Sequence, residues 1–130
     1  MTILVIDDEP DIREMICEML ELAGYRCLEA SNSKVADELL ETNEVDGVTL
    51  DLHMPGRSGI EWLETLESIR PGLARRTLLV TGSQLGPEQI RQLKRCGASL
   101  LFKPFDTERL LMEIKSRVNT ASDATPLPAV

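Results

Sequence analysis

The chain has 130 residues, the size of one ordinary domain with a single core. Hydrophobic residues make up 42% and charged residues 28%, the composition of a globular, water-soluble protein. The formal net charge of −8 argues against nucleic acid or an anionic membrane as a direct partner. Because the sequence shows neither a membrane-spanning apolar run nor a basic-then-apolar leader, we expect a cytoplasmic protein without membrane insertion.

The three cysteines, Cys17, Cys27 and Cys96, are far apart in the sequence and form no Cys-x-x-Cys pair. An odd number of widely spaced cysteines does not suggest a disulfide framework. We expect them to serve as small buried hydrophobic side chains in a reducing compartment rather than as metal ligands or redox centres.

Short apolar segments alternate with segments of helical periodicity, and the first two units occupy the N-terminal third of the chain. Residues 3–6 predict a buried strand, and residues 12–23 predict a helix with one apolar face that ends at Gly24. A second strand is expected at residues 25–30, and Ser33 is the predicted cap of a second helix.

The same alternation continues to the end of the predicted domain. Further strands are expected at residues 47–51, 77–81 and 99–102. The helices that follow them are expected to begin at Ser58 or Gly59, at Pro87, and at Asp106 or Thr107.

Beyond about residue 118 the sequence becomes small, polar and proline-bearing. We therefore predict a domain over residues 1–118 and a disordered tail or linker over residues 119–130. Five strand–helix units in series predict an α/β fold of the flavodoxin-like, doubly wound type, with a parallel sheet in the order 2-1-3-4-5.

Polar residues follow four of the predicted strands, where an open α/β sheet gathers its chemistry. Asp7, Asp8 and Asp51 bring three negative charges to this edge and Lys103 brings one positive charge, so the sum is −3 + 1 = −2. Carboxylate oxygens suit Mg²⁺, which would offset that charge and neutralise an incoming phosphoryl group. Asp51, alone at the end of the central strand, is the better candidate nucleophile.

Two further groups fit phosphoryl chemistry. Lys103 would neutralise one phosphate oxygen, and the hydroxyl of Thr81 would donate a hydrogen bond to another. Pro104 directly follows Lys103, and a cis peptide bond there would aim the lysine side chain.

Four motifs in this order resemble the receiver domain of two-component response regulators: Asp7-Asp8, Asp51-x-x-Met-Pro-Gly, Thr81-Gly82 and Lys103-Pro104-Phe105. The resemblance covers about residues 2–118. It implies phosphotransfer from a histidine kinase or histidine phosphotransfer protein to Asp51, with switching of an unknown output partner. The domain would not be an enzyme beyond its own phosphorylation and dephosphorylation, and phosphorylation-dependent dimerisation is a further expectation from the family.

The resemblance also implies roles for individual residues. Asp8, Asp51 and the backbone carbonyl of His53 would bind Mg²⁺, with Asp7 helping through water. Thr81 would be the switch hydroxyl, and Lys103 would pair with the phosphate. Leu100 departs from the family pattern, because a tyrosine or phenylalanine is usual three residues before the lysine.

Three readings of the chain compete. The first is a phosphoaccepting receiver, whose details also resemble the receivers attached to hybrid histidine kinases. The second is a pseudo-receiver that acts as a phosphorylation-independent interaction module, and Leu100 keeps it open. The third, an aspartyl-phosphate phosphatase, is disfavoured because Asp51 is followed two residues later by His53 rather than by a second aspartate.

His53 is the single histidine, and the sequence shows no glycine-rich ATP loop, so the chain is expected to receive phosphate rather than to act as a kinase. We expect the His53 side chain to be an exposed imidazole beside the site. Together with Ser83 it is a candidate for tuning the lifetime of a phosphoryl group. Trp62 is expected to pack in the core.

Overall fold

The computed structural model describes residues 1–54 and 57–124, with the side chains of the last helix described up to Val118. Five parallel strands form one sheet in the order β2-β1-β3-β4-β5, as predicted. The strands are β1 (Thr2–Ile6), β2 (Arg26–Ala30), β3 (Gly47–Asp51), β4 (Thr77–Thr81) and β5 (Ser99–Phe102).

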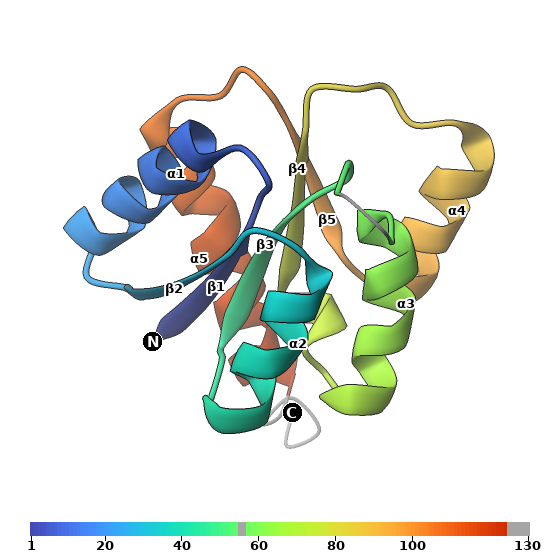
Figure 1. Cartoon of the computed structure of the whole chain (residues 1–130), viewed down its shortest axis with the longest axis horizontal. Helices are drawn as coiled ribbons and strands as arrows, with labels where there is room; N and C mark the ends of the chain where they lie inside the picture. The colour runs from blue at the N-terminus through green and yellow to red at the C-terminus, as the bar shows by residue number, and fades with distance from the viewer. Residues whose placement is uncertain (55–56, 125–130) are drawn as a thin grey trace.

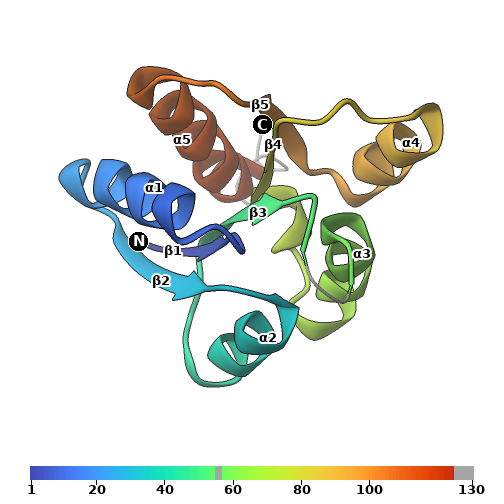
Figure 2. The same cartoon turned by 45° about the horizontal axis from the view of Figure 1, so that its top comes forward.

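Helices cover both faces of the sheet, which gives the predicted doubly wound architecture (Figures 1 and 2). One face carries α1 and α5, and the other carries α2, α3 and α4. The helices are α1 (Pro10–Leu22), α2 (Ser33–Thr42), α3 (Gly59–Ile69), α4 (Pro87–Cys96) and α5 (Thr107–Ala124). A short 3₁₀ turn, η1 (Ala74–Arg76), precedes β4 and was not predicted.

The alternation of side chains along the strands builds two hydrophobic cores, one on each face. On β1, Ile3 and Val5 pack with α1 and α5, whereas Leu4 and Ile6 pack with α2 and α3. All five residues of β3 and all five of β4 are buried. Trp62 is fully buried in the second of these cores, as expected.

Local capping explains where the helices begin and end. Asn32 caps α2, because its side chain accepts a hydrogen bond from the backbone N–H of Val35; the expected cap, Ser33, is the first helical residue instead. Ser58 forms a capping box with Glu61 at the start of α3. Gly97 ends α4 with a φ of 79°, in the left-handed region that favours glycine.

The last helix is longer than its sequence pattern indicates. Residues 107–124 are helical, so α5 continues past the expected end at residue 118. The rest of the predicted tail, residues 125–130, lies outside the described residues, as do Pro55 and Gly56 of the central motif. The proposed boundary between domain and tail therefore stays a prediction.

Gly59, the first residue of α3, allows this helix to start directly against the end of β3. Its backbone N–H donates to the carbonyl oxygen of Leu52 at 2.8 Å. A Cβ atom at this position would overlap the carbonyl oxygen of Asp51, which is backbone and has little freedom to move. The close approach fixes how the end of β3 is presented to the site.

We predict that Gly59→Ala destabilises the fold by about 1–3 kcal/mol, because the added methyl group forces β3 and α3 apart. Urea unfolding followed by circular dichroism measures the loss. Gly86→Ala is the matched control, since a Cβ there meets no atom within 4 Å and its φ of −76° suits alanine. The control should lose less than about 1 kcal/mol; equal losses in the two variants would contradict the argument.

Candidate functional site

The acidic residues predicted to share a site do lie together, at the upper end of the sheet in Figure 1. Ile6 pairs with Leu50 in the β1–β3 register, so Asp7 and Asp51 lie side by side as the next residue of each strand. Oxygen atoms from the side chains of Asp7, Asp8 and Asp51 all lie within 4.8 Å of one another. Three carboxylates at this spacing could hold a metal ion.

The members of this acidic cluster differ in their exposure to water. Asp7 is 1% exposed and Asp51 is 6% exposed, whereas Asp8 is exposed to solvent. Burial and the neighbouring Asp7 carboxylate raise the pKa of Asp51 to about 6, although Lys103 and the backbone N–H of His53 act in the opposite direction. Asp51 is therefore an acid that pays an electrostatic cost to ionise until a positive charge arrives.

Lys103 supplies the positive charge that the described structure places at the cluster. Its Nζ lies 3.6 Å from Oδ2 of Asp7, and its side chain is 20% exposed. The peptide bond between Lys103 and Pro104 is cis, as the sequence suggested. The backbone N–H of Lys103 donates to the carbonyl oxygen of Thr81 at 2.8 Å, which holds the ends of β4 and β5 together.

Thr81 ends β4 at the same edge, beside the acidic cluster. Its neighbour Val80 is the register partner of Asp51, and Thr81 itself is fully buried. The Thr81 hydroxyl accepts a hydrogen bond from the backbone N–H of Ser83 at 3.1 Å. Because a hydroxyl can also donate, its proton remains available for a second oxygen.

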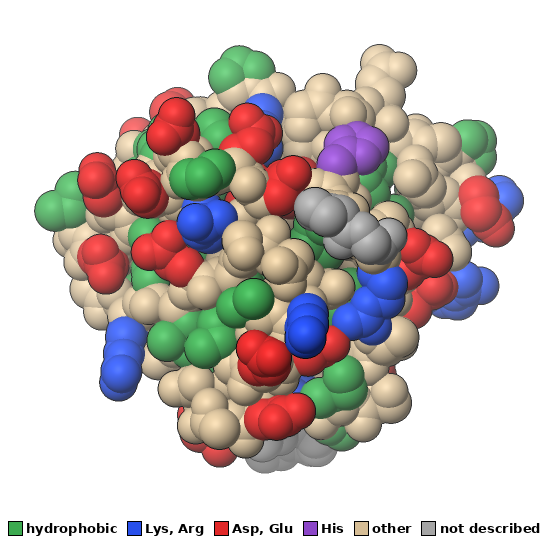
Figure 3. All heavy atoms as spheres, viewed as in Figure 1, with side chains coloured by type: hydrophobic (Ala, Val, Ile, Leu, Met, Phe, Trp, Pro, Cys, Tyr) green, Lys and Arg blue, Asp and Glu red, His purple; other side chains and the backbone are tan. Residues whose placement is uncertain are grey.

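His53 and Ser83 make a bridge between the loops that follow β3 and β4. The His53 Nε2 and Ser83 Oγ atoms lie 2.9 Å apart, and the backbone N–H of His53 is 3.4 Å from Oδ1 of Asp51. The imidazole is exposed, as predicted, and the histidine side chain is visible at the molecular surface in Figure 3. The sequence placed the two residues near each other but did not indicate the contact between them.

The sequence interpretation missed two groups that hold the site in place. Arg13 donates from its guanidinium to the carbonyl oxygen of Asp7 at 2.8 Å and to Glu29 at 3.0 Å, and so ties α1 to the acidic edge. Its place on the polar face of an amphipathic helix gave no sign of this role.

The second group is centred on Asp37 of α2. Its two carboxylate oxygens accept hydrogen bonds from the Trp62 indole at 2.8 Å and from Arg57 at 2.7 Å. Since Arg57 follows the central motif and Trp62 lies on α3, Asp37 anchors both to α2. A pairing between residues this far apart in sequence leaves no periodic signal in a single chain.

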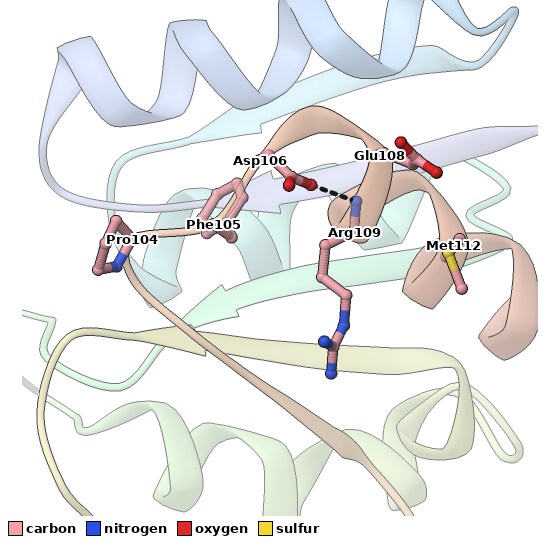
Figure 4. Close-up of a pocket in the computed structure, with 6 residues that line it drawn as sticks. All are labelled: Pro104, Phe105, Asp106, Glu108, Arg109 and Met112. Atoms are coloured by element: carbon pink, nitrogen blue, oxygen red, sulfur yellow. Dashed lines mark hydrogen bonds between the residues drawn. The ribbon is translucent and has the colours of Figure 1, made fainter.

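Surface hollows flank the acidic cluster without enclosing it. One of about 290 Å³ lies beside Asp8, His53 and the start of α3. A larger one of about 570 Å³ lies beyond Pro104, where the backbone N–H of Arg109 donates to Asp106 at the start of α5 (Figure 4). The larger hollow contains none of the clustered carboxylates, so the smaller one gives access to the site.

Comparison with protein families identifies the class of protein. Residues 3–115 match the response regulator receiver domain, and the chain belongs to this family. The five-stranded order and the converging acidic residues agree with that assignment. In the part of the chain that the structure describes, no helix has the length and apolar character to cross a membrane.

Two curated relatives and one solved structure show how the family is represented. The chain is 35% identical over 115 residues to the phosphate regulon transcriptional regulatory protein PhoB of Pseudomonas aeruginosa, covering 88% of this chain and 50% of that protein. It is 32% identical over 133 residues to the sensory/regulatory protein RpfC of Xanthomonas campestris pv. campestris, covering 100% of this chain and 18% of that one. The chain thus spans at most about half the length of these relatives.

The solved structure is a response regulator protein from Burkholderia pseudomallei with a phosphorylated aspartic acid, a calcium ion and citrate. It is 26% identical, with a TM-score of 0.77, and the match covers 98% of this chain and 74% of that one.

We predict that Asp51→Asn stabilises the metal-free protein at pH 7 to 8. The carboxyl group of Asp51 has a higher pKa in the folded protein, about 6, than its ordinary value of 3.8, so its ionisation lowers the stability of the parent as the pH rises between these values. The gain at neutral pH should approach about 3 kcal/mol and vanish below about pH 4. Urea unfolding in a metal chelator across this range measures the difference, and a gain independent of pH would contradict it.

Proposed function

We propose that this receiver domain accepts a phosphoryl group on Asp51 from the phosphohistidine of a histidine kinase or histidine phosphotransfer protein. The observation that carries the proposal is the convergence of the Asp7, Asp8 and Asp51 oxygens within 4.8 Å, with the Lys103 ammonium 3.6 Å from Asp7. The phosphorylated aspartic acid in the Burkholderia protein supports it by analogy.

The transfer uses Asp51 as the nucleophile. One of its carboxylate oxygens attacks phosphorus, the bond between phosphorus and the donor imidazole nitrogen breaks, and the donor leaves as neutral histidine after taking up a proton. Lys103 is placed to pair with one phosphoryl oxygen, and the buried Thr81 hydroxyl to donate a hydrogen bond to another. These are the roles that the sequence assigns to the three residues.

The donor set fits a hard divalent cation, and we assign it to Mg²⁺. Asp7, Asp8, Asp51 and the backbone carbonyl of His53 would hold the ion, and its charge would offset the repulsion between the carboxylates and the phosphoryl oxygens. Asp8 is exposed and Asp7 is buried, so the site is open on the side from which a cation and its waters arrive.

The resulting protein is a switch rather than an enzyme with a separate substrate. Phosphorylation of Asp51 changes the charge and contacts at the end of β3, and this shifts the population of two conformations that an output partner distinguishes. Transfer onto Asp51 and slow hydrolysis of the acyl phosphate are its only chemical steps. Placement in the cytoplasm, where such kinases carry their phosphohistidine, follows from this function.

The deciding experiment is intact mass spectrometry after incubation with acetyl phosphate, with and without Mg²⁺. We expect one added phosphoryl group in the parent, only with Mg²⁺, and none in Asp51→Asn. Mg²⁺ alone should also raise the melting temperature of the parent by more than that of Asp8→Asn, because Asp8 supplies a ligand. A folded parent that gains neither mass nor stability would favour the alternative, a pseudo-receiver that binds its partner without phosphorylation.

We further predict that the His53–Ser83 bridge slows hydrolysis of phosphorylated Asp51. The bridge closes one side of the site, so His53→Ala and Ser83→Ala should each shorten the phosphoryl lifetime by about fivefold, the equivalent of one hydrogen bond of about 1 kcal/mol. The double variant should decay no faster than either single variant, because each breaks the same contact. Decay of the phosphorylated mass after removal of acetyl phosphate measures the rate, and lifetimes equal to the parent would refute the role.

A further inference from the structure

Two of the three cysteine side chains meet beneath α1, although ten positions separate them in the sequence. Cys17 lies on α1 and Cys27 on β2, next to each other in the fold. The Cys27 Sγ atom donates to the carbonyl oxygen of Cys17 at 3.8 Å, and the two thiol groups also share a side-chain hydrogen bond. Neither belongs to the acidic cluster, so this contact is unexplained by phosphotransfer.

The two thiols differ in accessibility and acidity. Cys17 is 5% exposed, whereas Cys27 is partly exposed. When Cys27 loses its proton, the Cys17 thiol can donate to the thiolate, and this hydrogen bond lowers the pKa of Cys27 and raises that of Cys17. Burial and the carboxylates of Glu21 and Glu29 oppose the shift at Cys27 but do not reverse it. Cys27 is thus the more reactive, reachable sulfur, and Cys17 is a partner held beside it.

We propose that Cys17 and Cys27 are a redox modification site, which closes to an intramolecular disulfide when a peroxide reaches Cys27. The Cys27 thiolate attacks one peroxide oxygen, so a sulfur–oxygen bond forms, the oxygen–oxygen bond breaks and the other oxygen leaves as water after protonation. The Cys17 sulfur then attacks the sulfenic acid, the sulfur–oxygen bond breaks, and hydroxide leaves with the Cys17 proton as water. Two thiols lose two electrons, and one peroxide becomes two waters.

Contact between the thiols before reaction is what makes this pair suited to disulfide formation. A disulfide requires two cysteines whose side chains already point toward each other, and otherwise the backbone must move. Here the bond would link α1 to β2 with little displacement. It would close a short loop and restrict the unfolded chain, so the oxidised protein should be the more stable form.

Cys96 is the internal control that the chain provides. It lies at the end of α4, distant in the fold from α1 and β2, and burial and the nearby Glu64 carboxylate raise its pKa. Each of these properties disfavours attack on a peroxide. The proposal therefore predicts that Cys96 keeps its thiol under conditions in which the other two lose theirs.

The test treats the full chain with one equivalent of hydrogen peroxide, blocks the remaining thiols with an alkylating reagent, and measures intact mass and a peptide map. We expect two of the three thiols to be lost, a cross-link between the Cys17 and Cys27 peptides, and a melting temperature several degrees higher, all reversed by a dithiol reductant. Cys96→Ala should retain the cross-link, and Cys27→Ala should lose it.

Three alkylated cysteines, a Cys27 that proceeds to sulfinic acid while Cys17 stays free, or a cross-link through Cys96 or between two chains would each overturn the proposal. The peptide map of the parent decides this even if a cysteine variant fails to fold. The result is independent of phosphorylation, because Asp51→Asn should form the same disulfide.

Discussion

Repulsion between carboxylates at one edge of a parallel sheet is the constraint on which the rest of this structure depends. Asp7 and Asp51 are both buried there, and each makes ionisation of Asp51 less favourable through burial and charge. A single ammonium group, Lys103, offsets part of the cost from 3.6 Å away. The edge is therefore unsatisfied by design of the fold itself: it becomes electrostatically balanced only when further positive charge arrives.

Such a strained edge requires rigid supports, and these come from elements outside the site. Arg13 holds the backbone of Asp7 from α1, and the close contact of Gly59 with the Asp51 carbonyl fixes β3 against α3. Asp37 joins α2 to the loop after β3 through Arg57. All these contacts are hydrogen bonds or backbone packing at helix ends, so they resist separation of the carboxylates without supplying any charge to cancel them.

The sequence predicts what is periodic or local and misses what joins distant residues. The bounds of β3, β4 and β5, the sheet order and the convergence of Asp7, Asp8 and Asp51 follow from apolar runs and strand ends. The extra length of α5 and the choice of Asn32 as a cap depend on local alternatives of similar energy. The Asp37 anchor and the contact between Cys17 and Cys27 need the folded arrangement of α1, α2, β2 and α3, which no spacing rule encodes.

Leu100 shows how a departure from the family pattern acts in the finished fold. It pairs with Leu79 and packs against the core on the α2, α3 and α4 side, where an aliphatic side chain has no ring to turn. The direct link from the site to the edge strand is instead the backbone of Thr81, which pairs with Phe102 and accepts the N–H of Lys103 at 2.8 Å. Since Phe102 is 50% exposed, any displacement of Thr81 and Lys103 reaches the surface of β5 through two residues of main chain rather than through a rotating aromatic side chain.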